Sequence, residues 1–238
     1  MHRIRNAIRI MQSFAKDANF IKYDHESFYI IQNELIKSFS IHVSQAGFLY
    51  DVRFSVSPLC IESILVGCES IPLSTFTGHP GGYIISAHNR SESIESVMST
   101  IIADTKMIAI PFFQRSFNTQ TAISETLSLL QKTTYKQESI LWIPELYELA
   151  KAGLDYGLMY QCLMIRYKAN MEVKEKNNNP TRQKRIDDII VRQEQELYRI
   201  KMKDNAYFKM QNIENKKRNM IRLSRASCLG QGSLDSSG

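Results

Sequence analysis

The chain has 238 residues, a mass of 27.5 kDa and a formal net charge of +6. Hydrophobic residues make up 43% and charged residues 23%, which allows a packed core and excludes disorder of the whole chain. No run approaches the roughly 18 consecutive apolar residues of a membrane span. Residues 1–16 also lack the apolar stretch and cleavage site of a secretion signal. We therefore expect a globular protein without a transmembrane segment.

The positive charge belongs to one part of the chain. Residues 1–165 hold 13 Lys and Arg against 15 Asp and Glu, a net charge of −2. Residues 166–225 hold 17 against 8, a net charge of +9. A field concentrated in this way can attract nucleic acid, an acidic protein or an anionic membrane. The alternative is that these charges form an ordinary solvated helical face.

The cysteines are sparse and suit neither a disulfide framework nor a metal site. Cys60, Cys68, Cys162 and Cys228 include no CxxC pair, so reduced thiols and a cytoplasmic location are expected. Cys60 and Cys68 could be combined with His79 and His88 in a zinc site. Their spacings lack the close ligand pairs of structural zinc sites, so we predict no metal and no cofactor.

The chain opens with a helical pattern. Five apolar residues recur at helical spacing, with arginines and a lysine between them: Ile4, Ile8, Met11, Ala15 and Ala18. A basic amphipathic N-terminus could be a targeting sequence or an interfacial membrane anchor. We favour a helix that covers a sheet, because no cleavage signal follows.

Residues 27–32, 35–44 and 48–57 predict three antiparallel strands. In the third run every second residue is apolar, from Phe48 through Phe54 to Val56, which indicates a half-buried strand that ends at Pro58. Turns are expected at 32–34 and 45–47. Short connections of this kind produce a meander.

Residues 61–90 are harder to interpret. Strands are expected at 61–66 and 83–88, with a Gly-rich loop at 77–82 between them. The loop lacks the lysine and spacing of a phosphate-binding loop. His79 could be catalytic, but no acid or nucleophile is paired with it, so a structural turn is favoured.

Two helices are predicted next. Residues 91–104 carry an apolar stripe behind Ser91 or Ser93 as the N-cap. An apolar stretch over 107–113, interrupted by Pro111, precedes a helix through 122–132 that Thr119 or Thr121 caps.

Beyond Trp142 the pattern is almost wholly helical. Residues 177–180 (Asn-Asn-Asn-Pro) should end a helix, and one last long helix is expected from about Thr181 towards Leu223. This helix could form a coiled coil or a hairpin with residues 145–175. Residues 226–238 are rich in Ser and Gly and are expected to be disordered.

The predicted fold class is α+β: an antiparallel β-meander covered by helices, followed by a helical C-terminal hairpin or extension. The expected divisions are an α+β domain over 1–140, a basic helical region over 141–225 and the tail over 226–238.

The first 165 residues resemble a family of uncharacterised bacterial domains with suspected toxin-immunity roles. The resemblance lies in Ser27-Phe28-Tyr29, in Val56-Ser57-Pro58-Leu59 and in Ile110-Pro111-Phe112-Phe113 before a capped helix. It implies the fold more than the function, because the family has no catalytic signature to transfer.

No catalytic residue is predicted. The sequence contains none of the common hydrolase, metalloprotease, dinucleotide-binding or deaminase motifs. Asp51 with Arg53, or Glu62 with Glu69, could form an acid–base site. Strands commonly carry such charges on their solvated face, and catalytic geometry is spatial, so enzymatic activity stays open.

The leading hypothesis is a non-catalytic protein-interaction module, of the immunity or antitoxin type, that binds a protein such as a toxin. The alternative is nucleic-acid binding through phosphate contacts and stacking on Tyr198, Tyr207 and Phe208. Self-association through the last helix is a third expectation. The predicted binding residues are Arg182, Lys184, Arg185, Arg192, Arg199, Lys201, Lys203, Lys216, Lys217 and Arg218, with Lys209, Arg222 and Arg225 added for nucleic acid.

Overall fold

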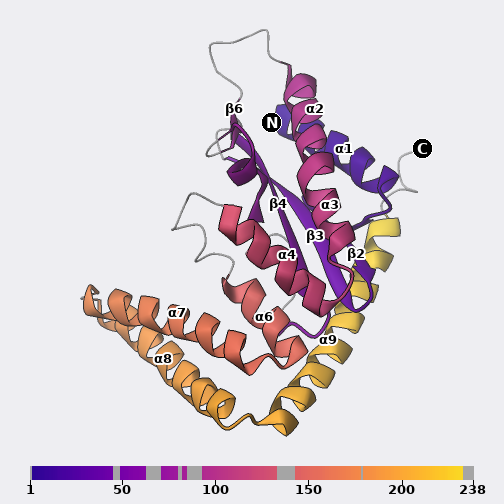
Figure 1. Cartoon of the computed structure of the whole chain (residues 1–238). Coiled ribbons are helices and arrows are strands. Elements are labelled where there is room, and N and C mark those ends of the chain that lie inside the picture. Colours follow the sequence, from indigo (N-terminus) through magenta and orange to yellow (C-terminus); the bar gives the residue numbers. More distant parts are fainter. Residues whose placement is uncertain are drawn as a thin grey trace.

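A computed structural model describes residues 2–44, 49–62, 71–79, 82–84, 93–132, 143–177 and 179–232, and the side chains of those that lie between residues 4 and 225. It has the predicted α+β fold, in which an antiparallel sheet is followed by C-terminal helices (Figure 1). The turn expected at 45–47, most of the strand expected at 61–66 and the end of the one expected at 83–88 lie outside the described residues.

The sheet is the predicted meander with short additions at its edges. The neighbouring strands run in the order β1-β2-β3-β4-β5, and β6 also pairs with β4, with every pairing antiparallel. The strand bounds are β1 Ile21–Lys22, β2 Ser27–Gln32, β3 Leu35–Val43, β4 Leu49–Pro58, β5 Ile71–Pro72 and β6 Tyr83–Ile84. The turn between β2 and β3 places Asn33 and Glu34 at φ of 51° and 64°, as a tight two-residue hairpin requires.

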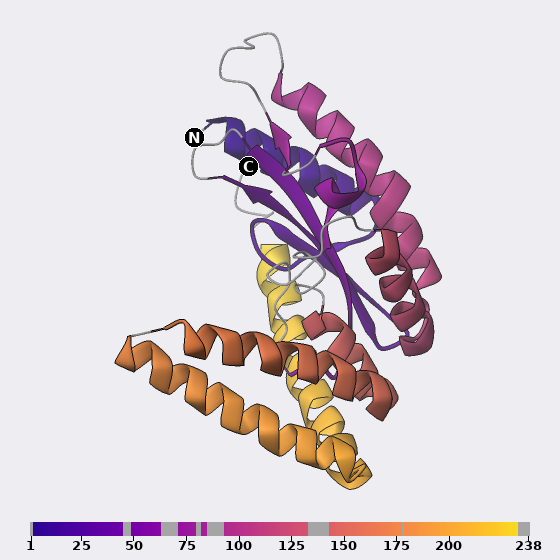
Figure 2. The ribbon, with the colours of Figure 1, turned by 60° about the vertical axis from the view of Figure 1, so that its left-hand side comes forward.

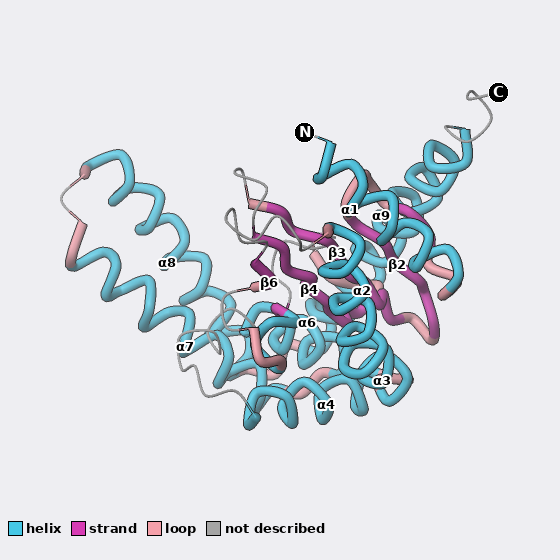
Figure 3. Tube along the Cα trace, turned by 90° about the horizontal axis from the view of Figure 1, so that it is seen from above, coloured by secondary structure: helices cyan, strands magenta, loops and turns pink. Residues whose placement is uncertain are grey.

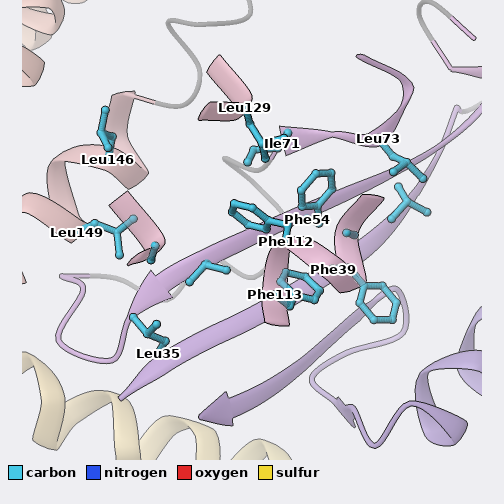
Figure 4. Close-up of a cluster of buried hydrophobic side chains, with 14 of the residues drawn as sticks. Leu35, Phe39, Phe54, Ile71, Leu73, Phe112, Phe113, Leu129, Leu146 and Leu149 are labelled. Carbon is cyan, nitrogen blue, oxygen red and sulfur yellow. The ribbon is translucent and has the colours of Figure 1, made fainter. Parts of the chain in front are cut away.

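One face of the sheet carries the main core. Phe39 of β3 lies opposite Phe54 of β4, and both side chains are fully buried. Phe112 packs edge-on to Phe54 with the ring centroids 5.5 Å apart. Figure 4 shows these rings together with Phe113, between the strands and the helices that cover them. The alternation in the sequence therefore identified the buried face of the sheet.

The helices that cover this face are α1 His2–Asp17, α2 Ile94–Asp104, α3 Ile110–Arg115 and α4 Thr119–Lys132. The predicted N-terminal covering helix is present as α1, and its Met11 is fully buried. Ser93 caps α2 by accepting a hydrogen bond from the Ser96 amide, as predicted. The predicted caps of α4 are wrong, because the side chain of Asn118 accepts the hydrogen bond from the amide of Thr121.

The apolar stretch around Pro111 is helical. A π-helical turn over Thr105–Ala109 joins α2 to α3, and Pro111 lies in the first turn of α3. Proline cannot donate to the carbonyl four residues before it and its ring collides with that carbonyl. The wider turn at 105–109 accommodates this defect, so the helix continues where the sequence suggested an interruption.

The segment Ile94–Arg115 is the one stretch of the described residues that is long and apolar enough to cross a membrane by length and composition. Its Met98, Ile101 and Phe112 are fully buried against the sheet. This packing agrees with the prediction of no transmembrane segment.

The C-terminal helices are α6 Ile143–Gly153, α7 Tyr156–Glu175, α8 Pro180–Lys201 and α9 Asn205–Gly232. α6 packs against β4. α7 and α8 form a hairpin, one of the two arrangements left open by the sequence, and it projects away from the sheet (Figures 1 and 3). α9 then runs back to the sheet, as Figure 2 shows. There Leu223 is buried with Tyr29, Ile36 and Leu59 on the second face of the sheet.

The prediction of one continuous last helix is wrong. α8 ends at Lys201, and Lys203 has a positive φ of 49°. Asp204 then caps α9 by accepting a hydrogen bond from the Tyr207 amide over 3.2 Å. The reversal at 202–204 sends the two halves in different directions. α9 also continues to Gly232, beyond Ala226, where we expected the disordered tail to begin.

Candidate binding surface on the C-terminal helices

Capping residues define where the two helices of the hairpin arm begin. We define this arm as α7 with α8. Asp155 caps α7 through the Leu158 amide, and Asn179 caps α8 through the Arg182 amide. Pro180 follows at the first position of α8, where its missing N–H costs no hydrogen bond. The Asn-Pro punctuation seen in the sequence therefore forms the tip of the arm.

One face of α8 packs against α7 and the body of the protein. Five residues at spacings of three and four are buried along this face: Ile186, Ile190, Gln193, Leu197 and Ile200. Polar contacts reinforce the seam. The Lys174 ammonium lies 2.6 Å from the Asp187 carboxylate, and the Asn170 amide donates to Gln193 over 3.1 Å. The arm is thus a packed element with one free outer face.

Four of the ten predicted binding residues have contacts within the chain. Arg199 lies 3.7 Å from the centroid of the Tyr207 ring, and Lys201 lies 5.8 Å from that of Tyr160. Lys216 forms an ion pair with Glu34. Arg218 donates to the backbone carbonyl of Glu62 and to the side chain of Asn215.

The other six predicted cations are exposed and have no side-chain partner among the described residues. They are Arg182, Lys184, Arg185, Arg192, Lys203 and Lys217. The structure does not join all ten into one surface, because α8 and α9 diverge after residue 202 (Figure 2).

An apolar ridge lies beside the free arginines on the outer face of α8. Val191, Tyr198 and Met202 are 50%, 66% and 65% exposed. Their spacings of seven and four place them on one side of the helix, opposite the buried seam. Arg185 and Arg192 are also seven residues apart. Arg192 directly follows Val191, so the two arginines lie about 100° round the helix from the apolar residues. We call these five residues the α8 ridge. Sequence reasoning selected its arginines but missed Val191 and Met202 as surface residues, although their offset from the buried series was a visible signal.

The base of the arm contains a buried polar junction. Tyr147 of α6 is 3% exposed and donates to the Glu196 carboxylate of α8 over 2.5 Å. Lys151 is also 3% exposed and lies 3.9 Å from the same carboxylate oxygen. Burial raises the pKa of Glu148 to about 7, opposed by the positive charge of Lys151.

The amide side chains of α9 attach it to the body. Asn219 is fully buried and donates to the carbonyls of Leu59 and Ile61 over 3.0 and 2.7 Å. Asn212 donates to the carbonyl of Lys151 over 3.3 Å. The carbonyls of Leu59 and Ile61 follow the end of β4, whereas the carbonyl of Lys151 lies in the last turn of α6 and also accepts from the Leu154 amide. An apolar residue in place of these asparagines could not donate the hydrogen bonds to the body.

Of the two residue pairs considered for catalysis, Asp51 with Arg53 lies wholly within the described residues. Asp51 is committed to Ser74, whose hydroxyl donates to it over 2.9 Å, and burial raises the Asp51 pKa. Burial also raises the pKa of the Cys60 thiol to about 11, which keeps it protonated and poorly nucleophilic at neutral pH. Glu69, Cys68 and His88 lie outside the described residues.

The described residues contain no cluster of three His, Cys, Asp or Glu that could hold a metal ion. Hollows lined by described residues occur near the C-terminal helices. One of about 450 Å³ lies between α7 and the end of α8, beside Tyr160 and Ile200. Another, of about 240 Å³, lies between α9 and the body, beside Cys60 and Lys216.

Comparisons with protein-family models, with curated proteins and with solved structures find no match. The resemblance to the bacterial immunity-type domains therefore stays a prediction.

Proposed function

We propose that this protein is an interaction module that binds an acidic protein through the α8 ridge. The observation that carries the proposal is the exposure of Val191, Tyr198 and Met202 beside arginines, on a helix whose other face is already packed. Met, Tyr and Arg are enriched in protein interfaces, where aromatic and Arg side chains provide much of the binding energy.

The same ridge supports a protein partner more than a nucleic acid. Phosphate binding needs closely placed cations that follow a backbone. Here Asp188 and Glu194 are exposed on α8 among the arginines, and Lys216 and Arg218 are held within the chain on α9. Exposed aliphatic side chains at Val191 and Met202 add nothing to phosphate binding, whereas they add buried area to a protein interface.

The sequence suggested a toxin-neutralising role, and that role is one biological form of this proposal. Such a module needs a stable scaffold, a complementary surface and no reactive group. The sheet and its covering helices provide the scaffold, and the arm holds the α8 ridge away from it (Figure 3).

A photo-crosslinking residue at position 191 tests the proposal in cells that make the full chain. We expect a crosslinked acidic protein, and loss of the adduct when Arg185→Glu and Arg192→Glu are added. With that partner purified, the double reversal should weaken binding at least about tenfold, as expected for interface hot spots. Lys168→Glu reverses an exposed cation on α7 and should leave binding unchanged. A nuclease-sensitive adduct, or an adduct that survives the reversals, would overturn the proposal.

A further inference from the structure

The outer face of α9 carries four exposed apolar residues, whereas an ordinary surface helix turns its apolar residues toward the core. Met210, Ile213, Met220 and Ile221 are 53%, 56%, 49% and 53% exposed. The inner face contains the buried Phe208 and Leu223 together with the asparagines that bind the backbone carbonyls of the body. The burial of apolar side chains against the body therefore does not account for the four that are exposed.

Three of these four residues, Met210, Ile213 and Met220, lie on a heptad pattern, and Ile221 lies beside it. Six positions are separated alternately by four and three residues, as are the a and d positions of a coiled coil: Ala206, Met210, Ile213, Lys217, Met220 and Ser224. We call these six residues the α9 seam. A seam of this width fits one partner helix, whereas a helix that lies in a membrane surface needs a broader apolar face.

We infer that the α9 seam binds one acidic amphipathic helix of a protein partner. This inference rests on the proposed function, because it names the class of partner and adds a second contact surface. The seam provides the apolar contact, and the charge of α9 selects the partner.

The charge excludes a second copy of this chain as the favoured occupant. Residues 205–225 hold six Lys and Arg and a single acid, Glu214. A parallel pair of α9 helices would bring the two Lys217 side chains together, and an antiparallel pair aligned over the seam would place each Lys217 against Ile213 of the other copy, where it has no carboxylate. Like charges placed together in an interface oppose association.

Lys217 also indicates what the partner helix must carry. Its side chain is exposed and has no partner among the described residues. Once covered, its ammonium would need a carboxylate, because an unpaired buried charge is costly. A lysine at one a position typically specifies the register of a coiled coil. A partner acid facing Lys217 would set that register.

A designed peptide provides the test on the full chain. The probe has four heptads, with Leu at a and d, Glu at e and g, and one Glu at the a position that faces Lys217. A matched peptide carries Lys at e and g. We expect the acidic peptide to bind and the basic one not to bind. Lys217→Glu should weaken binding about tenfold or more, as for other close interface charges, whereas Lys168→Glu should not change it.

A charge swap makes the test specific to the seam. A peptide with Lys in place of the facing Glu should bind the Lys217→Glu variant better than the original peptide does. Failure of this rescue, or no binding of the acidic peptide, overturns the inference. It is also overturned if the chain dimerises with rising concentration in sedimentation, or if vesicles of phosphatidylserine and phosphatidylcholine bind it in a manner that Met210→Asp abolishes. These measurements use no residue of the α8 ridge, so the crosslink at position 191 can persist when this inference fails.

Discussion

Tyr147 donates its hydroxyl hydrogen bond to the Glu196 carboxylate over 2.5 Å, and this contact joins α6 to α8. The tyrosine is 3% exposed, so the bond lies within the junction between the body and the arm. Burial and the negative charge of Glu196 together raise the pKa of Tyr147. The hydroxyl therefore stays protonated and continues to donate throughout the neutral range.

Tyr147→Phe should destabilise the protein because it removes this donor and leaves a partly buried carboxylate with less compensation. The expected loss in the free energy of unfolding is about 1.5–3 kcal/mol, as for other hydrogen bonds to charged groups. Urea unfolding followed by circular dichroism measures it. Tyr167→Phe removes an exposed hydrogen bond to Glu194 and should change stability by less than about 0.5 kcal/mol. Equal losses in the two variants would contradict the role assigned to the junction.

The half-buried carboxyl of Glu148 should make stability depend on pH. Its pKa is raised from 4.5 to about 7 by burial and by the charges of Glu62 and Glu196, against the opposing charge of Lys151. The unfolded chain therefore releases this proton at lower pH than the folded chain. The free energy of unfolding should fall as the pH rises from about 4.5 to 7.

Glu148→Gln isolates this contribution from the other titrating groups. Urea unfolding of the variant at pH 5 and pH 8 should show a smaller decrease than that of the parent protein. A decrease of the same size in both proteins would show that Glu148 is not the group responsible.

The sheet could be predicted from sequence because its pattern is local. Strands 27–32 and 35–44 were expected within a residue of their observed ends, since side chains alternate between the two faces of a strand. The segment around Pro111 was harder. Proline at that position normally interrupts a helix, and the π-helical turn that accommodates it depends on backbone geometry that residue types do not reveal.

The break between α8 and α9 could not be predicted from a glycine, which often follows the end of a helix, because none is present there. Lys203 adopts the left-handed conformation there instead. The amides of Lys203 and Asp204 bind the carbonyls of Ile200 and Arg199, which satisfies the end of α8. The signal of a new helix that the sequence did contain was Asp204, which caps α9.

The candidate surface could be predicted only in part. Charge identified the C-terminal helices, but charge alone does not show that Lys216 is paired with Glu34 while Lys217 is free. The same holds for Met210 and Ile213. An apolar residue on a helix is expected to face the core, and only the packing of the neighbouring asparagines against the body shows that these two face outward.

Phe112→Ala tests the main core. The ring is fully buried and packs against Phe54 and Phe113. Removing it should lower the free energy of unfolding by about 3–5 kcal/mol, through lost burial and the cavity left behind. The exposed Phe117 is a matched control, and its change to Ala should cost less than about 1 kcal/mol. Thermal unfolding of both variants provides the comparison.

Asn219→Ala tests how α9 is attached. The substitution leaves the carbonyls of Leu59 and Ile61 without the donor they have now. An unsatisfied buried acceptor costs about 1–3 kcal/mol, so stability should fall within that range. Asn219→Leu should not restore it, because added apolar area supplies no donor. Recovery of stability with leucine would show that packing, and not hydrogen bonding, holds α9 in place.

Lys203→Gly tests the reversal that separates α8 from α9. The lysine has a φ of 49°, and this left-handed conformation costs an L-residue roughly 1–2 kcal/mol. Glycine avoids that cost but gains freedom in the unfolded chain, worth about 0.4–1 kcal/mol. The free energy of unfolding should therefore stay the same or rise by up to about 1.5 kcal/mol. Lys209→Gly, at an exposed position inside α9, should lower it by about 1 kcal/mol. If the two variants lose stability equally, α8 continues into α9 as one helix. That result would contradict the finding that α8 and α9 run in different directions after residue 202.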